Sequence, residues 1–211
     1  MPTVLFDVNE TLLDLGPARS LLAERFDGSI DASDWFAELL RLSFVSSVTD
    51  TYAPFTVLAG HALTTVATRS GHTVTTDDRT AVGDVVRTLP AHADVTAGLG
   101  TLADNGVRIA ALTNSPLATA RAQLDSAGIA GYFDRIMSVD MVERFKPHRS
   151  VYEAACREMG VAPSDATMVA AHDWDVAGAM TAGLTGVFVA RPNQTWSPAF
   201  DQPDAVVADI P

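Results

Sequence analysis

Short apolar runs alternate with segments of helical periodicity along the C-terminal half of the chain. The apolar runs predict strands at residues 107–112, 135–139, 167–171, 186–190 and 204–207. The helical periodicity predicts helices at residues 116–127, 150–159 and 175–182, and a glycine directly follows each of them. Strands that alternate with helices in this way are typical of βαβ units, so we expect a parallel sheet.

A different pattern fills the segment that follows the N-terminal strand pattern. Apolar residues recur there at helical spacing, and no strand pattern interrupts them. The predicted helices span residues 18–26, 35–48, 54–69 and 77–89. We therefore expect an α/β fold with a Rossmann-like parallel-sheet core, formed by residues 1–14 and 91–211. An all-helical cap at residues 15–90 is inserted after the first strand, with loops at 13–17 and 90–94 as hinges.

Composition and charge narrow the classes of function. The 211 residues are 47% hydrophobic and 19% charged, which is typical of a globular protein. The formal net charge of −12 argues against binding to nucleic acid, which needs clustered Lys and Arg. An anionic substrate would need a local positive site within this negative field. The single cysteine, Cys156, excludes an intramolecular disulfide and is expected to be a buried structural thiol.

The sequence also bears on location and assembly. Strand-like residues follow Met1 almost at once, without the pattern of a secretory leader, and no uncharged apolar run reaches spanning length. We therefore expect a cytoplasmic protein that does not interact with membranes. The apolar faces on the cap helices are also compatible with pairing of two copies into a homodimer.

The most informative single residue is Asp7, which directly follows the strand pattern at 3–6. Ligands bind at the carboxyl ends of strands in open parallel sheets, so Asp7 is expected where chemistry takes place. A carboxylate there can act as a nucleophile that forms a covalent adduct, which water then hydrolyses. Thr11 follows four residues later. The structural alternative is an aspartate that binds its own turn.

Polar residues also follow the strand predicted at 107–112. Thr113, Asn114 and Ser115 open a predicted helix, with Ser115 as its N-cap and Pro116 as its first residue. The hydroxyl, amide and backbone N–H groups of this loop also suit the binding of an anion, helped by the helix dipole. The sequence leaves both readings, a capping loop and an anion site, open.

Two further loops carry charged residues. Lys146, directly before Pro147, is either a surface residue or a charge aimed into the ligand crevice. His172 and Asp175 follow the strand predicted at 167–171, and their structural alternatives are a loop residue and a helix N-cap. Each structural alternative is reasonable for one loop taken alone.

Taken together, the four loops resemble the motifs of the haloacid dehalogenase superfamily, including a helical cap inserted after the first motif. The likeness runs from Phe6 to about Ala190, and it is greatest to the type II, L-2-haloacid dehalogenases. The matching residues are Phe6-Asp7 with Thr11-Leu12, Leu112-Thr113-Asn114-Ser115-Pro116, Lys146-Pro147 before Val151-Tyr152, and Trp174-Asp175-x-Ala177-Gly178-Ala179.

This resemblance implies a hydrolase that works without a cofactor on small 2-haloacids. Asp7 would attack C2 and form an ester that water hydrolyses. Lys146 would hold Asp7 ionised, Thr11 would orient its loop, and Asp175, or alternatively His172, would activate the water. The residues expected to contact the anionic substrate are Asn9, Thr113, Asn114, Phe36, His172 and Arg41.

The sequence departs from the dehalogenase pattern in the pocket for the leaving group. The family usually carries an Arg on the first long cap helix, and a gap-free comparison puts Phe36 there. Arg41 is the nearest cation, but five residues of helix turn it about 140° away from Phe36. Arg19 is another substitute. Ala170 and His172 replace the usual Ser and Asn of the fourth loop.

Two other functions stay open. One is a Mg²⁺-dependent phosphatase of a small phosphorylated metabolite, the commonest activity in the superfamily. Against it, Asn9 stands where the general acid is expected and cannot supply a proton, and Ala171 replaces an acidic metal position. Asp7 and Asp175 alone would bind Mg²⁺ weakly. The other is a catalytically weak binding or regulatory protein that keeps the fold.

Overall fold

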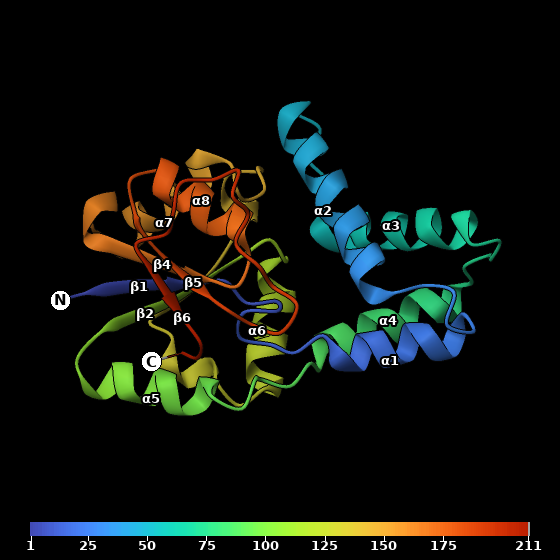
Figure 1. The fold of residues 1–211 in the computed structure, drawn as a ribbon, viewed down its shortest axis with the longest axis horizontal. Helices are drawn as coiled ribbons and strands as arrows, with labels where there is room; N and C mark the ends of the chain where they lie inside the picture. Colours follow the sequence, from blue (N-terminus) through green and yellow to red (C-terminus); the bar gives the residue numbers. More distant parts are fainter. Residues whose placement is uncertain (211) are drawn as a thin grey trace.

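The centre of the molecule is a parallel sheet, seen in a computed structural model in which residues 1–210 are described (Figure 1). Its strands are β1 (Thr3–Phe6), β2 (Arg108–Thr113), β3 (Arg135–Ser138), β4 (Ala166–Ala170), β5 (Thr185–Val189) and β6 (Ala205–Val207). The strand order is β3-β2-β1-β4-β5-β6, and every neighbouring pair is parallel. All five strands predicted in the C-terminal half are therefore confirmed.

The register of the sheet brings three loops to one edge. Phe6 of β1 lies opposite Ala111 of β2 and Val169 of β4, so these strands end at about the same level. The backbone N–H of Asp7 continues the ladder by donating to Val169 O at 3.1 Å. The residues that follow the three strands, Asp7 among them, consequently meet at the carboxyl edge, where parallel sheets bind ligands.

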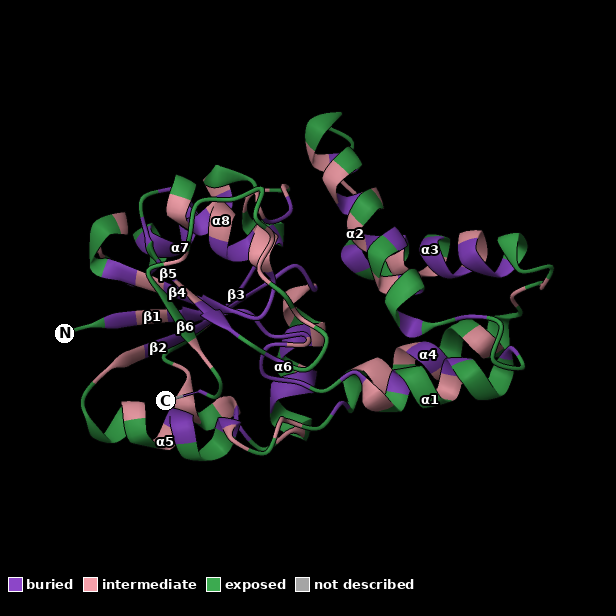
Figure 2. Cartoon of the chain, in the orientation of Figure 1, coloured by how far each residue is buried: buried purple, intermediate pink, exposed green. Residues whose placement is uncertain are grey.

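Helices cover both faces of the sheet. Figure 1 shows α7 (Arg149–Met159) and α8 (Asp173–Thr181) on one face, and α5 (Val95–Asp104) with α6 (Leu117–Ser126) on the other. Successive strand residues point to opposite faces, so Leu5 joins the apolar cluster under α7 and α8, whereas Phe6 joins the cluster over α5. Figure 2 shows the buried strands between these layers.

Four more helices lie to one side of the sheet, between β1 and α5 in the sequence. They are α1 (Gly16–Arg25), α2 (Ala32–Val48), α3 (Phe55–Arg69) and α4 (Thr76–Arg87). We call them the cap (Figure 1). Within the cap, α2 packs on α3 and α1 packs on α4. The start of α4 is fixed by a capping box, in which the Thr75 side chain accepts from the Asp78 backbone and the Asp78 side chain accepts from the Thr75 backbone.

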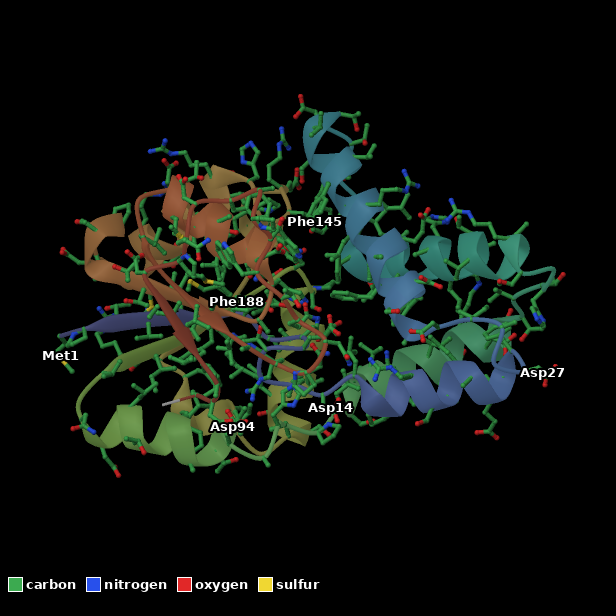
Figure 3. The ribbon with its side chains drawn as sticks, viewed as in Figure 1. Met1, Asp14, Asp27, Asp94, Phe145 and Phe188 are labelled. Atoms are coloured by element: carbon green, nitrogen blue, oxygen red, sulfur yellow. The ribbon has the colours of Figure 1, made fainter. Side chains whose placement is uncertain are left out.

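The two chain segments that join the cap to the sheet lie side by side. Asp14 N donates to Pro90 O at 2.8 Å, and His92 N donates to Leu12 O at 2.9 Å. Asp14 is labelled at this junction in Figure 3. The entry and exit of the cap are thus held together by backbone hydrogen bonds. The domain limits at residues 15 and 90 stay predictions.

Some local predictions are wrong. The helix after β2 begins at Leu117, not Pro116, and Ser115 does not cap it, because Pro116 holds the N-cap position with an extended ψ of 145°. Helix α5 is not predicted at all, since Gly98 and Gly100 within its Val-Thr-Ala-Gly-Leu-Gly segment lower the helix propensity. Cys156 is buried as expected. No helix within residues 1–210 combines the length and apolar character needed to cross a membrane.

Gly178 of α8 offers a test of the packing behind Lys146. A Cβ at this position would lie 2.8 Å from Tyr152 Oη and 3.0 Å from Pro147 Cα, so Gly178→Ala forces α8 and the Lys146–Pro147 segment apart. We expect a loss of about 1–3 kcal/mol in the free energy of unfolding, measured by urea denaturation.

Gly100→Ala on α5 is the matched control, because its Cβ would meet only Tyr132 at 3.9 Å. There the gain in helix propensity, about 0.5–1 kcal/mol, stabilises the protein or leaves its stability unchanged. Equal effects of the two substitutions would contradict this account of the packing.

Candidate active site

Asp7 lies in a nearly closed site in which both of its carboxylate oxygens are hydrogen-bonded. Oδ1 accepts from Lys146 Nζ at 2.8 Å. Oδ2 accepts from Thr11 Oγ1 at 2.7 Å and lies 3.3 Å from Nδ1 of His172. Thr11 Oγ1 also accepts from the backbone N–H of Ala171 at 2.9 Å, so it links the ends of β1 and β4. The structure therefore orients the Asp7 carboxylate from three directions.

The ammonium group of Lys146 is fully buried, and all three of its N–H donors are used. They reach Asp7 Oδ1, Asp175 Oδ2 at 2.6 Å and the carbonyl oxygen of Leu112 at 2.9 Å. The backbone N–H of Lys146 donates to Asn114 Oδ1 at 3.0 Å. Lys146 thus joins the loops that follow β1, β2 and β4, and the surface alternative for this residue is wrong.

Asp175 is fully buried on the first turn of α8 and does not cap that helix, whose N-cap is His172. Its Oδ2 accepts from Lys146, and its Oδ1 accepts from the hydroxyl of Tyr152 at 2.6 Å. Tyr152 belongs to α7 and is itself fully buried. The N-cap alternative for Asp175 is therefore wrong, and its carboxylate points into the site.

Burial and the neighbouring charges shift the pKa values of these side chains in opposite directions. Burial raises the pKa of the Asp7 carboxyl, but the charge of Lys146 and the hydrogen bond from His172 outweigh it, so the net pKa is well below its usual range. Burial lowers the pKa of Lys146, but Asp175 and Asp7 raise it above 10.5 overall. The pKa of Asp175 is raised by burial and by Asp7, against the effect of Lys146. Asp7 and Lys146 are consequently an ion pair at neutral pH.

His172 carries a second positive charge at this site. Besides Asp7, it contacts Glu10 Oε2 through Nε2 at 2.9 Å. Burial lowers the pKa of the imidazole, but the hydrogen bonds to Asp7 and Glu10 raise it to about 9. The ring stacks on Phe36 of α2 and on Trp174 of α8, with ring centroids 5.7 and 5.1 Å away. A protonated imidazole that is stacked on aromatic rings is favoured by cation–π attraction.

Neutral polar residues of the first two loops are bound to one another. Asn9 Nδ2 donates to Ser115 Oγ at 3.3 Å, and Asn9 Oδ1 accepts from Gln123 Nε2 at 3.0 Å. Thr113 Oγ1 accepts from the backbone N–H of Ser115 at 3.1 Å. All of these side chains are buried. Asn9, Thr113 and Asn114 therefore line the same edge of the sheet as Asp7, as expected.

A cavity of about 450 Å³ opens between this edge and the cap. Asn9 and Ser115 lie on its sheet side, and Phe36 lies on its cap side. The expected substrate cation Arg41 is not among the lining residues. It pairs with Glu38 at 2.7 Å on another surface, as the turn of helix from Phe36 implies. Arg19 also lies elsewhere, beside Asp14 and His92.

Several residues of the site could not be predicted from the sequence. The family pattern includes Tyr152, but nothing in the sequence shows that its hydroxyl reaches Asp175 from a different helix. Glu10 lies in the first motif, yet its contact with His172 depends on the left-handed backbone at Glu10, where φ is 61°. Arg79 and Arg87 line the cavity from α4, and their eight-residue spacing places them on one helix face.

The residues present do not fit a Mg²⁺ site. Mg²⁺ needs oxygen ligands in octahedral geometry. Here the ammonium of Lys146 bridges Asp7 and Asp175 and occupies the place between the two carboxylates. Residue 171 is an alanine, and no group of three potential metal-binding side chains occurs within residues 1–210.

Two known proteins are similar to this chain over most of its length. (S)-2-haloacid dehalogenase 1 of Pseudomonas sp. strain CBS-3 is 30% identical over 192 residues, which cover 90% of this chain and 85% of the relative. (S)-2-haloacid dehalogenase 4A of Burkholderia cepacia is 29% identical over 193 residues, covering 89% of this chain and 82% of the relative.

A solved structure is similar over the full length of the chain. The L-2-haloacid dehalogenase from Xanthobacter autotrophicus superposes with a TM-score of 0.92 at 22% identity, covering 100% of this chain and 95% of that one. This similarity confirms the predicted α/β core with a helical cap. A family model described as haloacid dehalogenase-like hydrolase matches residues 1–183. The chain therefore belongs to the haloacid dehalogenase-like hydrolase family.

Proposed function

We propose that this chain is a metal-independent hydrolase that removes halide from 2-haloacids through a covalent ester on Asp7. The observation that carries the proposal is the buried ion pair between Asp7 Oδ1 and Lys146 Nζ. It keeps the carboxylate ionised, fixes its orientation and limits its contact with water, as a nucleophile requires. The name of the Pseudomonas relative, (S)-2-haloacid dehalogenase, supports the same reaction.

The reaction has two steps. In the first, an oxygen of Asp7 attacks C2, the carbon–halogen bond breaks, and the halide leaves with the bonding electron pair. Halide needs no proton on leaving, which suits the neutral Asn9 next to the nucleophile. In the second, water adds to the carbonyl carbon of the ester, and its hydrolysis releases a 2-hydroxyacid and one proton and restores Asp7.

The anionic substrate is held by neutral donors and the two buried cations. Asn114 Oδ1 is bound to the backbone of Lys146, which leaves the Asn114 Nδ2 hydrogens to bind the substrate carboxylate. Thr113 contributes to substrate binding by holding this loop in place, since its hydroxyl accepts from the backbone N–H of Ser115. Asn9 and Phe36 border the cavity in which the halide departs. Arg41 is not proposed as a halide ligand, since it pairs with Glu38 outside that cavity.

Asp175 is the better candidate for the group that activates water. His172 is protonated at neutral pH, because its pKa is raised to about 9, and an imidazolium has no free lone pair to accept a proton. Each oxygen of Asp175 accepts one hydrogen bond and keeps a second lone pair, and burial raises its pKa toward that of an effective base. Lys146 and His172 then stabilise the charge that develops on the ester carbonyl oxygen.

The proposal also bears on the molecule that the chain binds. We infer that the partner is a small anionic molecule. The homodimer and the cytoplasmic location stay predictions.

A catalytically weak binding protein is a second candidate, favoured by the displaced Arg41, but a buried, ionised nucleophile beside two cations would be costly to keep without a reaction.

Replacing the nucleophile tests the covalent step. Asp7→Asn should lower halide release from 2-chloropropionate by roughly 10⁴-fold or more, because an amide oxygen is a poor nucleophile and the ester cannot form. Halide release is measured by ion chromatography. In the wild-type protein, rapid quenching and mass spectrometry should detect an ester on the peptide that contains Asp7. Unchanged activity of the variant, or no ester during turnover, would contradict the mechanism.

The metal requirement separates the dehalogenase from the phosphatase. We expect EDTA to leave the rate of halide release unchanged, because Lys146 already neutralises Asp7 and Asp175. A panel of phosphate esters with added Mg²⁺ should release no phosphate above background. Phosphate release that EDTA abolishes, without release of halide, would reverse the assignment.

The pH dependence of KM reports on His172. In the folded protein His172 is protonated at neutral pH and loses its positive charge as pH rises through its pKa of about 9. Above that pH, Lys146 alone offsets Asp7 and Glu10 against an anionic substrate, since the pKa of Lys146 is raised further. We expect KM for 2-chloropropionate to rise on the order of tenfold across this range.

His172→Asn is the control for this titration. Asn cannot ionise, so the alkaline change in KM near pH 9 should disappear, and KM at pH 7 should already be high. An unchanged pH profile in this variant would assign the titration to another group.

A further inference from the structure

The cavity reaches Asn9, two residues after the nucleophile, and is large for a small haloacid. Its volume of about 450 Å³ falls within the range of roughly 300–1,000 Å³ that holds drug-sized ligands. A haloacetate or a 2-halopropionate would leave most of this space to water. The size of the cavity therefore points to a substrate with a larger group attached to C2.

The walls of the cavity are mainly apolar. They are formed by three cap helices and include Trp35, Leu39, Phe55, Leu63 and Val82. Asn9 and Ser115 line the sheet side, and the polar cap residues Thr56, His61, Arg79 and Arg87 lie among the apolar ones. A ligand with a charged head and an apolar chain matches this lining, with the head at the sheet and the chain among the cap helices.

Helix α4 leaves space in the cavity because a glycine, Gly83, faces it. Arg79, Val82, Gly83, Val86 and Arg87 all line the cavity, at the spacing of one helix face. A Cβ at Gly83 would meet only Arg87 Nη1, at 3.6 Å. There is therefore room for a Cβ at Gly83 beside the guanidinium group of Arg87. The stem of each arginine adds apolar surface, while its guanidinium group is bound within the cap. Arg79 donates to Gly60 O at 2.7 Å and to Thr64 Oγ1 at 2.6 Å, and Arg87 pairs with Asp84.

We propose that this cavity binds the alkyl chain of 2-haloalkanoates of medium length, roughly six to ten carbons, and that these are better substrates than 2-halopropionates. The inference rests on the proposed function, and it concerns the substrate class of the same site. The carboxylate and C2 lie at Asn114 and Asp7, and the chain runs along α4 past Gly83.

The first experiment compares substrates of increasing chain length with the wild-type protein. The series is 2-chloropropionate, 2-chlorobutanoate, 2-chlorohexanoate and 2-chlorooctanoate, and the measured quantity is kcat/KM for halide release. We expect kcat/KM to rise by about two- to fourfold for each added methylene, because the chain leaves water. A flat or falling series, with 2-chloropropionate turned over, would overturn the inference and leave the proposed function intact.

A variant that fills the cavity provides the second experiment. Gly83→Leu introduces a side chain where the structure has room for it and favours the helix. It should lower kcat/KM for 2-chlorooctanoate by about tenfold or more and change that for 2-chloropropionate by less than about twofold. Thr80→Leu, on the exposed face of the same helix and outside the cavity lining, is the matched control and should change neither.

Binding measured without turnover separates this inference from the proposed reaction. By calorimetry, octanoate should bind the wild-type protein at least tenfold more tightly than propionate, and Gly83→Leu should remove the difference. This result supports the cavity assignment even if no haloacid releases halide, in which case the proposed function fails alone. Equal affinity for the two acids, or a chain-length preference that survives in Gly83→Leu, would overturn the inference.

Discussion

The structure of the site depends on one buried ammonium group. Lys146 Nζ lies between two carboxylates and a carbonyl oxygen, and these come from the ends of β1 and β2 and from α8. Burying a charge costs several kcal/mol unless it is fully hydrogen-bonded and paired. Because all three donors have partners, the arrangement is stable only when the loops are assembled together. The same contacts that complete the fold at this edge also ionise and orient Asp7.

The core and the cap contribute differently to the proposed chemistry. The charged groups that surround Asp7 all come from the core, from loops at the carboxyl edge of the sheet and from the first turn of α8. The cap contributes Phe36, whose ring stacks on His172, and most of the cavity wall. Phe145, labelled in Figure 3, packs directly before Lys146 against Tyr52 and Phe55 of the cap region. Aromatic contacts thus hold the cap next to the charged cluster.

Much of this arrangement could be predicted from the sequence, for physical reasons that differ between residues. Asp7 and Asp175 lie beyond the ends of buried strands and Thr113 is the last residue of one, and parallel strands bring such residues to one edge, so topology alone predicts their proximity. Lys146 follows no strand directly, and only the family likeness placed it. The roles of Glu10 and Tyr152 could not be predicted, because each depends on a contact distant in sequence. The position of Arg41, in contrast, could be predicted, since the helical repeat indicates that its side chain faces away from Phe36.

The paired segments at the base of the cap have a consequence for evolution. Leu12 and Asp14 are hydrogen-bonded to His92 and Pro90, so the chain leaves the sheet and returns to it at a single point. For the strands of the sheet, the whole insertion is therefore equivalent to a short closed loop, whatever helices it contains. Changes in the length or packing of those helices can alter which molecules are admitted, while the groups that break and form bonds stay where they are. Selectivity and reactivity can accordingly diversify along separate routes in proteins built on this plan.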